Sequence, residues 1–223
     1  MDEMKGGYVS SWELAALVAT GVGHVAVEIA TTGMAGAAEN LGSAAHYYNM
    51  IAGVVWGLYM LWRGFHTKGA VAAWGLQRAE FAGALKWACA FGVPGLGVLA
   101  GWGAVAGRFP PPSTFWLLIA AYPVWGIAQQ FALQGLVTRN LRPFVPLRAA
   151  RAVTAAALFS GAHFPEYHLM LLTFPLGVAF AWIFERYRNV WALGIVHGLL
   201  GAAAYYFVLG QDPGAELLRM LGR

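Results

Sequence analysis

Polar side chains with useful chemistry occur in apolar stretches of this chain, where such residues are rare. They are Gln129, Gln130, His163, Glu166 and His197. Histidine exchanges a proton near neutral pH and a carboxylate can pair with it, whereas an amide forms hydrogen bonds but does not titrate. If these stretches cross a membrane, each polar group marks a candidate functional site, because it is costly there. The alternative is that they only bond helices together, at about 0.6 kcal/mol per contact.

These residues lie at similar depths within their apolar stretches. Gln130 and His197 each stand nine residues from the nearest arginine in the sequence, and His163 stands twelve residues from its nearest one. At about 1.5 Å of helix rise per residue, the spacings correspond to about 14 and 18 Å. His24, followed one turn later by Glu28, also reaches about 18 Å from the start of its stretch. Chance would scatter such residues over about 30 Å of hydrocarbon, so the spacing predicts one polar cavity near mid-membrane.

The composition of the chain is that of a membrane protein. Of its 223 residues, 59% are hydrophobic and 11% are charged, and the mean hydropathy is +0.58. A soluble domain carries about a quarter charged residues, and a disordered one carries far less apolar surface than this. The single cysteine, Cys89, excludes a disulfide framework and a cysteine-rich metal site. The basic residues are scattered between apolar runs, so we expect no nucleic-acid partner.

Seven apolar runs are candidates to cross the hydrocarbon core as helices, which takes about 20 residues. With the N-terminus inside, eleven of the 14 lysines and arginines fall on the inner side, as the positive-inside rule requires. We therefore expect an all-α, polytopic transmembrane helix bundle of about seven spans, N-in and C-out, forming a single integral membrane domain over residues 1–223. The expected spans are 12–31, 44–62, 81–105, 113–137, 149–164, 167–184 and 190–210.

Three short patterns stand in order between residues 125 and 201. The first reads Gln129-Gln130-Phe-Ala-Leu-Gln134, the second reads Phe159-Ser-Gly-Ala-His163, and the third begins at His197 and ends at Gly201. This region resembles the CPBP family (CAAX protease and bacteriocin-processing, or Abi) of membrane-embedded endopeptidases. That family carries Glu-Glu-x-x-x-Arg, Phe-x-x-x-His and His-x-x-x-Asn/Asp on consecutive helices. The second motif is therefore complete here, the third ends in glycine, and the first has glutamine at all three charged positions.

The resemblance implies a role for each candidate residue. His163 takes the position that activates a water molecule, and His197 takes the position that stabilises the oxyanion. Gln129 and Gln130 stand at the acid positions but cannot act as bases, since an amide has no titratable proton. Glu166, three residues beyond His163, is then the favoured source of the missing carboxylate.

Three functions remain open at this point. The first is an active endopeptidase that cuts a hydrophobic or membrane-associated peptide, with Glu166 or Glu28 supplying the carboxylate. The second is a pseudoprotease that binds a peptide, a lipid or a partner helix without cutting it; the joint loss of three charges favours it, because no unpaired charge is left in lipid. The third is a structural subunit that docks on partner membrane subunits through small-residue faces such as Gly97/Gly101 and Gly103/Gly107.

The sequence assigns no cofactor. His163, Glu166 and His197 are residue types that bind metals, but the spacing of a His-Glu-x-x-His site is absent. We expect a multi-pass protein of a prokaryotic inner (plasma) membrane. Its expected partners are membrane lipid and a hydrophobic peptide or membrane-protein substrate.

Overall fold

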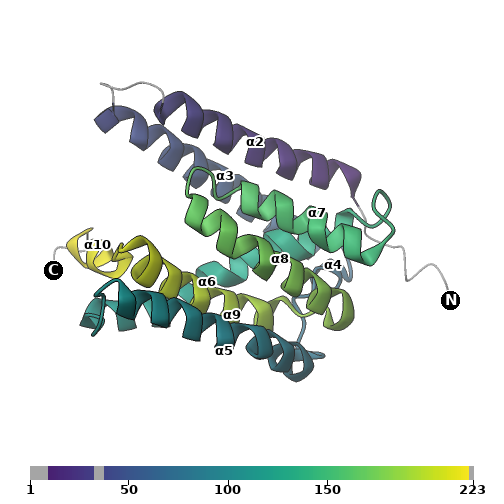
Figure 1. Ribbon diagram of the computed structural model, residues 1–223. Helices are drawn as coiled ribbons and strands as arrows, with labels where there is room; N and C mark the ends of the chain where they lie inside the picture. Colours follow the sequence, from purple (N-terminus) through teal and green to yellow (C-terminus); the bar gives the residue numbers. More distant parts are fainter. Residues whose placement is uncertain (1–9, 33–37, 221–223) are drawn as a thin grey trace.

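The computed structural model describes residues 10–32 and 38–220 of the chain, and the regular secondary structure in these ranges is helical. The expectation of an all-α protein is thereby confirmed. Two helices continue directly into π-helical segments, so α6 with η1 and α9 with η2 each form one continuous rod. In chain order (Figure 1) the elements are α2 (Ser11–Thr32), α3 (Ala38–His66), α4 (Ala70–Ala73), α5 (Phe81–Val105), α6 (Ser113–Gln130), η1 (Phe131–Thr138), α7 (Arg148–Gly161), α8 (Tyr167–Tyr187), α9 (Val190–Ala204), η2 (Tyr205–Leu209) and α10 (Pro213–Met220).

Five helices in the described part of the chain are long and apolar enough to cross a membrane: Ser11–Thr31, Phe81–Val105, Ser113–Thr138, Tyr167–Tyr187 and Val190–Leu209. The chain is therefore a multi-pass integral membrane protein. The other two expected spans are also helical, as α3 and α7. However, α7 has only 14 residues, about 21 Å at 1.5 Å per residue, which is shorter than a hydrocarbon core of about 30 Å. The seven-span count and the N-in, C-out orientation stay predictions.

Helices α6 and α9 touch at their backbones because glycines line the crossing. A Cβ atom built on Gly198 would lie 2.4 Å from the Cα of Pro123, and one built on Gly126 would lie 2.4 Å from the carbonyl oxygen of Gly194. A carbon atom needs about 3.5–4.0 Å from another carbon, so no side chain fits at these positions. Small residues are typical where membrane helices approach this closely, since packing drives their association in lipid. The crossing fixes the position of α6 against α9.

The apolar core is shared by α5, α8 and α9, and α7 packs against α8 from the other side. A Cβ on Gly177 of α8 would lie 3.0 Å from Ala156 of α7, so these two helices are also close. Fully buried side chains of the core include Ala84 and Ala88 of α5, Phe180 and Phe184 of α8, and Val190 and Leu193 of α9.

The small-residue faces of α5 differ from one another. Gly103 is buried, and a Cβ there would lie 2.1 Å from the ring of Phe207 in η2. The expectation that Gly103 and Gly107 form a face for an external partner is therefore wrong, because Phe207 of the same chain covers Gly103. Gly97 and Gly101 are exposed, and a Cβ at either position would meet nothing within 4 Å.

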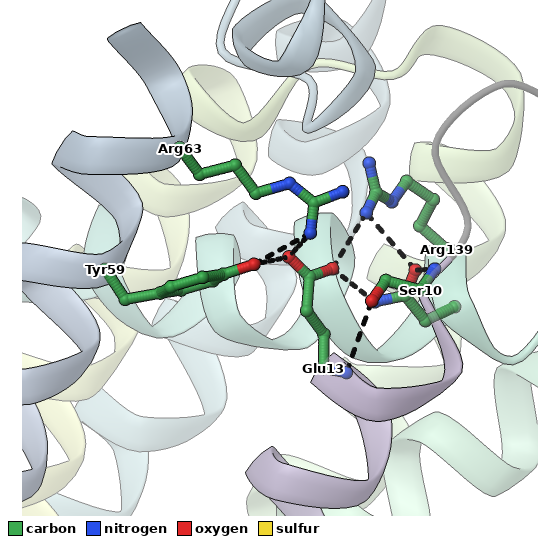
Figure 2. A network of polar contacts seen from close by, with 6 residues as sticks. Ser10, Glu13, Tyr59, Arg63 and Arg139 are labelled. Atoms are coloured by element: carbon green, nitrogen blue, oxygen red, sulfur yellow. Dashed lines mark hydrogen bonds and ion pairs between the residues drawn. The ribbon is translucent and has the colours of Figure 1, made fainter. Parts of the chain in front are cut away.

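Helices α2 and α3 run side by side and reach the rest of the bundle mainly where α2 meets η1 (Figure 1). The contact centres on Glu13 (Figure 2). Its side chain is 0% exposed. Its Oε1 accepts hydrogen bonds from the Tyr59 hydroxyl at 2.7 Å and from Arg63, both on α3. Its Oε2 accepts from Arg139 Nη2 at 3.2 Å and from the side-chain amide of Asn140 at 3.0 Å. One carboxylate thus joins α2, α3 and the end of η1.

Sequence reasoning missed this ion-pair cluster. A glutamate in the first turn of a span is usually solvated, and its partners, Arg63 and Arg139, stand 50 and 126 residues away in the sequence. Removing one member of a buried ion pair typically costs about 3–5 kcal/mol, because the remaining charge is left without compensation. The cluster is therefore a specific attachment of the α2–α3 hairpin to the core.

Candidate active site

A cavity of about 1480 Å³ lies between α2 and the helices α5 to α9, and we call it the central cavity. Most of its lining is aliphatic or aromatic and comes from helices that are far apart in sequence. The polar side chains predicted from the sequence are among its lining residues, with one exception described below. Those that line it are His24 and Glu28 of α2, Gln129 of α6, His163 and Glu166 of the turn before α8, and His197 of α9.

His163 is held by the backbone that precedes it. The expected span extended to residue 164, but α7 ends at Gly161 and His163 lies in the following turn. Its Nδ1 lies 2.8 Å from the carbonyl oxygen of Phe159. A carbonyl oxygen only accepts, so Nδ1 carries the proton in the neutral imidazole and Nε2 keeps its lone pair. The Phe-x-x-x-His spacing thus sets the tautomer through a main-chain contact one turn back.

His197 is held by Gln129 across the α6–α9 crossing. The Nε2 atom of His197 lies 3.0 Å from the side-chain oxygen Oε1 of Gln129, and the histidine is buried. Because an amide oxygen accepts, the proton of neutral His197 resides on Nε2. Its Nδ1 is buried and has no hydrogen-bond partner among the described residues. Gln129 therefore orients His197, and its own amide nitrogen is left as a donor.

The two histidines meet at one aromatic ring. The ring centroid of Phe159 lies 4.8 Å from that of His163 and 5.5 Å from that of His197, edge-on in both cases. These contacts keep the two imidazole centres within about 10 Å of each other. The first and last residues of the second motif and the first residue of the third motif thus form one group in the cavity wall.

Gln130 does not belong to this group. Its side chain is 0% exposed and is absent from the lining of the central cavity. Its Oε1 accepts a hydrogen bond from Gln134 Nε2 at 3.1 Å, and Gln134 Oε1 accepts one from the Thr138 hydroxyl at 3.0 Å. Neighbouring residues on a helix point about 100° apart, which is why Gln129 and Gln130 face different surroundings. The result is a neutral ladder of side-chain hydrogen bonds along η1.

Glu166 lies at the rim of the cavity. Its backbone N–H donates to the carbonyl oxygen of His163 at 2.8 Å, and its side chain is exposed. Among the described residues, its carboxylate makes no hydrogen bond to either histidine. The structure likewise brings no three His, Cys, Asp or Glu side chains of the described residues into a group that could hold a metal ion.

Tyr122 is a cavity residue that the sequence analysis did not single out. A Cβ built on Gly201 would lie 2.7 Å from Cε1 of Tyr122, so the tyrosine ring occupies the space of a side chain at position 201. Tyr122 lines the central cavity together with Tyr205, and their ring centroids are 5.8 Å apart. The spacing of seven residues between Tyr122 and Gln129 was the available signal, because it places both side chains on one face of α6.

The comparison with known proteins bears on this region of the chain. Residues 111–203 match the family model described as type II CAAX prenyl endopeptidase Rce1-like. This segment is similar to the CAAX protease family, and we call it the CAAX protease segment. It runs from the start of α6 nearly to the end of α9, and it contains Gln129, His163, Glu166 and His197. No curated protein and no solved structure matches the chain.

The match agrees with the resemblance to the CAAX protease family that the three motifs indicated. The match does not extend to α2, α3 or α5, although α2 and α5 line the central cavity beside the CAAX protease segment.

Proposed function

We propose that this chain is a membrane-embedded endopeptidase of the CAAX-protease type in which His163 activates a water molecule. The observation that carries the proposal is the contact of His163 Nδ1 with the Phe159 carbonyl oxygen at 2.8 Å. It leaves Nε2 as the basic nitrogen of a residue that lines the central cavity. A general base needs such an acceptor within reach of a water proton.

In the proposed reaction, a water molecule gives a proton to His163 Nε2 while its oxygen bonds to the carbon of the scissile amide. The carbonyl oxygen becomes an oxyanion, and N–H donors must face it. We assign this role to the side-chain amide nitrogen of Gln129, which His197 holds in position by donating its Nε2–H to Gln129 Oε1 at 3.0 Å. When the C–N bond breaks, the protonated His163 returns its proton to the leaving amine. Gln129 thus contributes as a donor and an orienting group, not as a base.

The charge that develops on His163 needs a carboxylate, since the Phe159 carbonyl sets the tautomer but supplies no negative charge. Glu166 and Glu28 both line the central cavity, and we assign the role to Glu166 because it follows His163 in the same turn. Turnover in Glu166→Gln, Glu28→Gln and the double variant tests this assignment. Full activity in the double variant would remove both carboxylates from the mechanism. Loss in Glu28→Gln alone would move the role to α2.

A second candidate function is binding of a hydrophobic peptide, lipid or partner helix without cleavage. It is favoured by the ladder of Gln130, Gln134 and Thr138, which leaves the positions of the first motif without a charged side chain. For either function we propose that the chain acts as a single membrane domain. The support is that α2, outside the CAAX protease segment, forms one wall of the central cavity.

The test is cleavage of quenched fluorescent peptides with an apolar membrane anchor by the purified protein in lipid nanodiscs. We expect His163→Ala to lower kcat at least about 100-fold, the usual contribution of a general base. His168→Ala is the matched control, because His168 is exposed and lies outside the central cavity. If the wild type binds these peptides as tightly as His163→Ala and neither protein cuts them, the endopeptidase proposal fails and the binding function stands.

A further inference from the structure

A second cluster of charged residues lies apart from the central cavity, at the end of α8. The Glu185 carboxylate, 6% exposed, is approached by three arginines of the segment between η1 and α7 and of α7 itself. Arg151 Nε donates to it at 2.9 Å and Arg142 Nη2 at 3.1 Å, while Arg148 Nε lies 3.8 Å away. We call these four residues the Glu185 cluster. Three guanidinium groups share one carboxylate, so the cluster carries a local surplus of two positive charges.

The three arginines are not equivalent. Arg151 is buried and is fully engaged, because it also donates to the carbonyl oxygens of Val145 and Pro146. The side chains of Arg142 and Arg148 are 29% and 48% exposed. The surplus charge of the Glu185 cluster is therefore presented at the surface by these two residues.

An exposed tryptophan lies beside the exposed arginines. The guanidinium carbon of Arg148 is 5.5 Å from the ring centroid of Trp182, whose side chain is 53% exposed. Tryptophan is enriched at the boundary between hydrocarbon and headgroups. Trp182 stands three residues before Glu185 and five before the end of α8, which is about 4.5 and 7.5 Å along the helix axis. These positions near the end of the helix favour a location of the Glu185 cluster at the level of the lipid headgroups.

The surroundings of the cluster add further positive charge. Arg188 follows α8 directly. Burial lowers the pKa of Arg188, the nearby charge of Arg142 lowers it further, and the charge of Glu185 raises it. No second described carboxylate pairs with Arg142 or Arg148. A negatively charged group from outside the chain would therefore meet two exposed donors and a net positive field.

We propose that Arg142, Arg148 and Trp182 form a binding site for the phosphate headgroup of an anionic phospholipid. Guanidinium groups match phosphate oxygens with paired N–H donors, which makes arginine the usual residue for this task. The tryptophan ring supplies an apolar surface for the glycerol and the first acyl carbons. Glu185 holds the arginines at a fixed spacing and leaves their outer N–H groups for the lipid.

The experiment measures how many phosphatidylglycerol and phosphatidylcholine molecules the protein retains in native mass spectra after release from nanodiscs that contain equal amounts of both lipids. Arg148→Gln should lower the retained ratio of phosphatidylglycerol to phosphatidylcholine about fivefold, which is the effect typical of one basic residue near an anionic surface. The double variant Arg142→Gln/Arg148→Gln should lower this ratio about 25-fold. Arg186→Gln is the matched control, because Arg186 is exposed on the same helix end, its guanidinium lies over the ring of Tyr187, and it is not among the arginines that form ion pairs with Glu185 in the described part of the chain. It should change the ratio less than twofold. Arg148→Gln alone leaves the two short contacts of Glu185 intact, so the result does not depend on the fold of the double variant.

Two results would overturn the proposal. An equal loss in Arg186→Gln and Arg148→Gln would show a general attraction of the basic end to anionic lipid and no defined site. Displacement of the retained phosphatidylglycerol by inorganic phosphate, at concentrations that leave Arg148→Gln unaffected, would assign the site to a soluble anion.

Discussion

Substitution of Gly198 by alanine is a direct test of how the α6–α9 crossing positions the candidate active site. The added Cβ would lie 2.4 Å from the Cα of Pro123. Carbon atoms in contact need about 3.5–4.0 Å, so the two helices must separate by at least about 1.1 Å. The contact of His197 Nε2 with Gln129 Oε1 would then lengthen from 3.0 Å to about 4 Å, beyond the range of a hydrogen bond.

The expected cost follows from overpacking, which destabilises a well-packed interior by about 1–3 kcal/mol. For a domain of this size each kcal/mol lowers Tm by about 2–4 °C, so we expect a decrease of about 2–12 °C in lipid or detergent. Cleavage should fall further than stability, because His197 and Gln129 both lose their orientation. Thermal unfolding and kcat are to be measured on the same preparation, below the Tm of the variant.

Gly97→Ala is the matched control, since a Cβ at Gly97 meets nothing within 4 Å and the residue also lies within a membrane-spanning helix. It should leave kcat unchanged and keep or slightly raise Tm, because alanine favours the helix over glycine. If Gly198→Ala matches Gly97→Ala in both Tm and kcat, the close crossing does not set the geometry of His197 and the reasoning is refuted.

Three further predictions concern single side chains of the described structure. Gly201→Asn should lower Tm because the Tyr122 ring occupies its space, and adding Tyr122→Ala should restore Tm; a Gly201→Asn protein as stable as wild type would contradict the packing. Gln130→Glu should lower the free energy of unfolding by about 3 kcal/mol, because it buries a carboxylate beside an amide. Gln129→Glu places its carboxylate next to His197, so it should lower this free energy less and raise any cleavage. Equal losses in unfolding assays would argue against the different surroundings of the two glutamines. Glu13→Gln should lower the free energy of unfolding by about 3–5 kcal/mol because Arg63 and Arg139 lose their shared carboxylate, while the exposed Glu80→Gln should change it by less than about 0.5 kcal/mol.

Residue depth was the part of the site that the sequence could predict. Helix rise per residue is nearly constant, so counting from flanking arginines placed Gln130, His163 and His197 at compatible levels. The structure brings His163 and His197 to one cavity, together with Gln129 instead of Gln130. Rotation about the helix axis could not be predicted in the same way. Gln130 is adjacent to Gln129 in sequence, yet it turns away from the cavity toward Gln134. Which of the two faces His197 depends on how α6 packs against α9, and that is a property of the whole bundle.

Contacts between distant segments were also beyond reach from the sequence. Glu13 and Glu185 each form ion pairs with arginines of other elements, and no local sequence pattern indicates which arginines these are. The end of α7 at Gly161 is a similar case, because the apolar run continues to Phe164 while the chain turns before it. The composition of these segments predicts an apolar environment. It does not predict whether lipid or other parts of the protein surround each segment.

The wall that α2 contributes to the central cavity has a kinetic consequence. Side chains of this helix, such as Val22 and Ile29, line the cavity and are largely uncovered by the rest of the described chain. A hydrophobic substrate that stays in the bilayer meets this wall laterally, by diffusion in two dimensions. For the proposed endopeptidase, the concentration that governs the encounter of this substrate with His163 is then its mole fraction in the membrane, and not its molarity in the whole sample. Adding inert lipid at constant protein and substrate should slow turnover in proportion to the dilution of the surface.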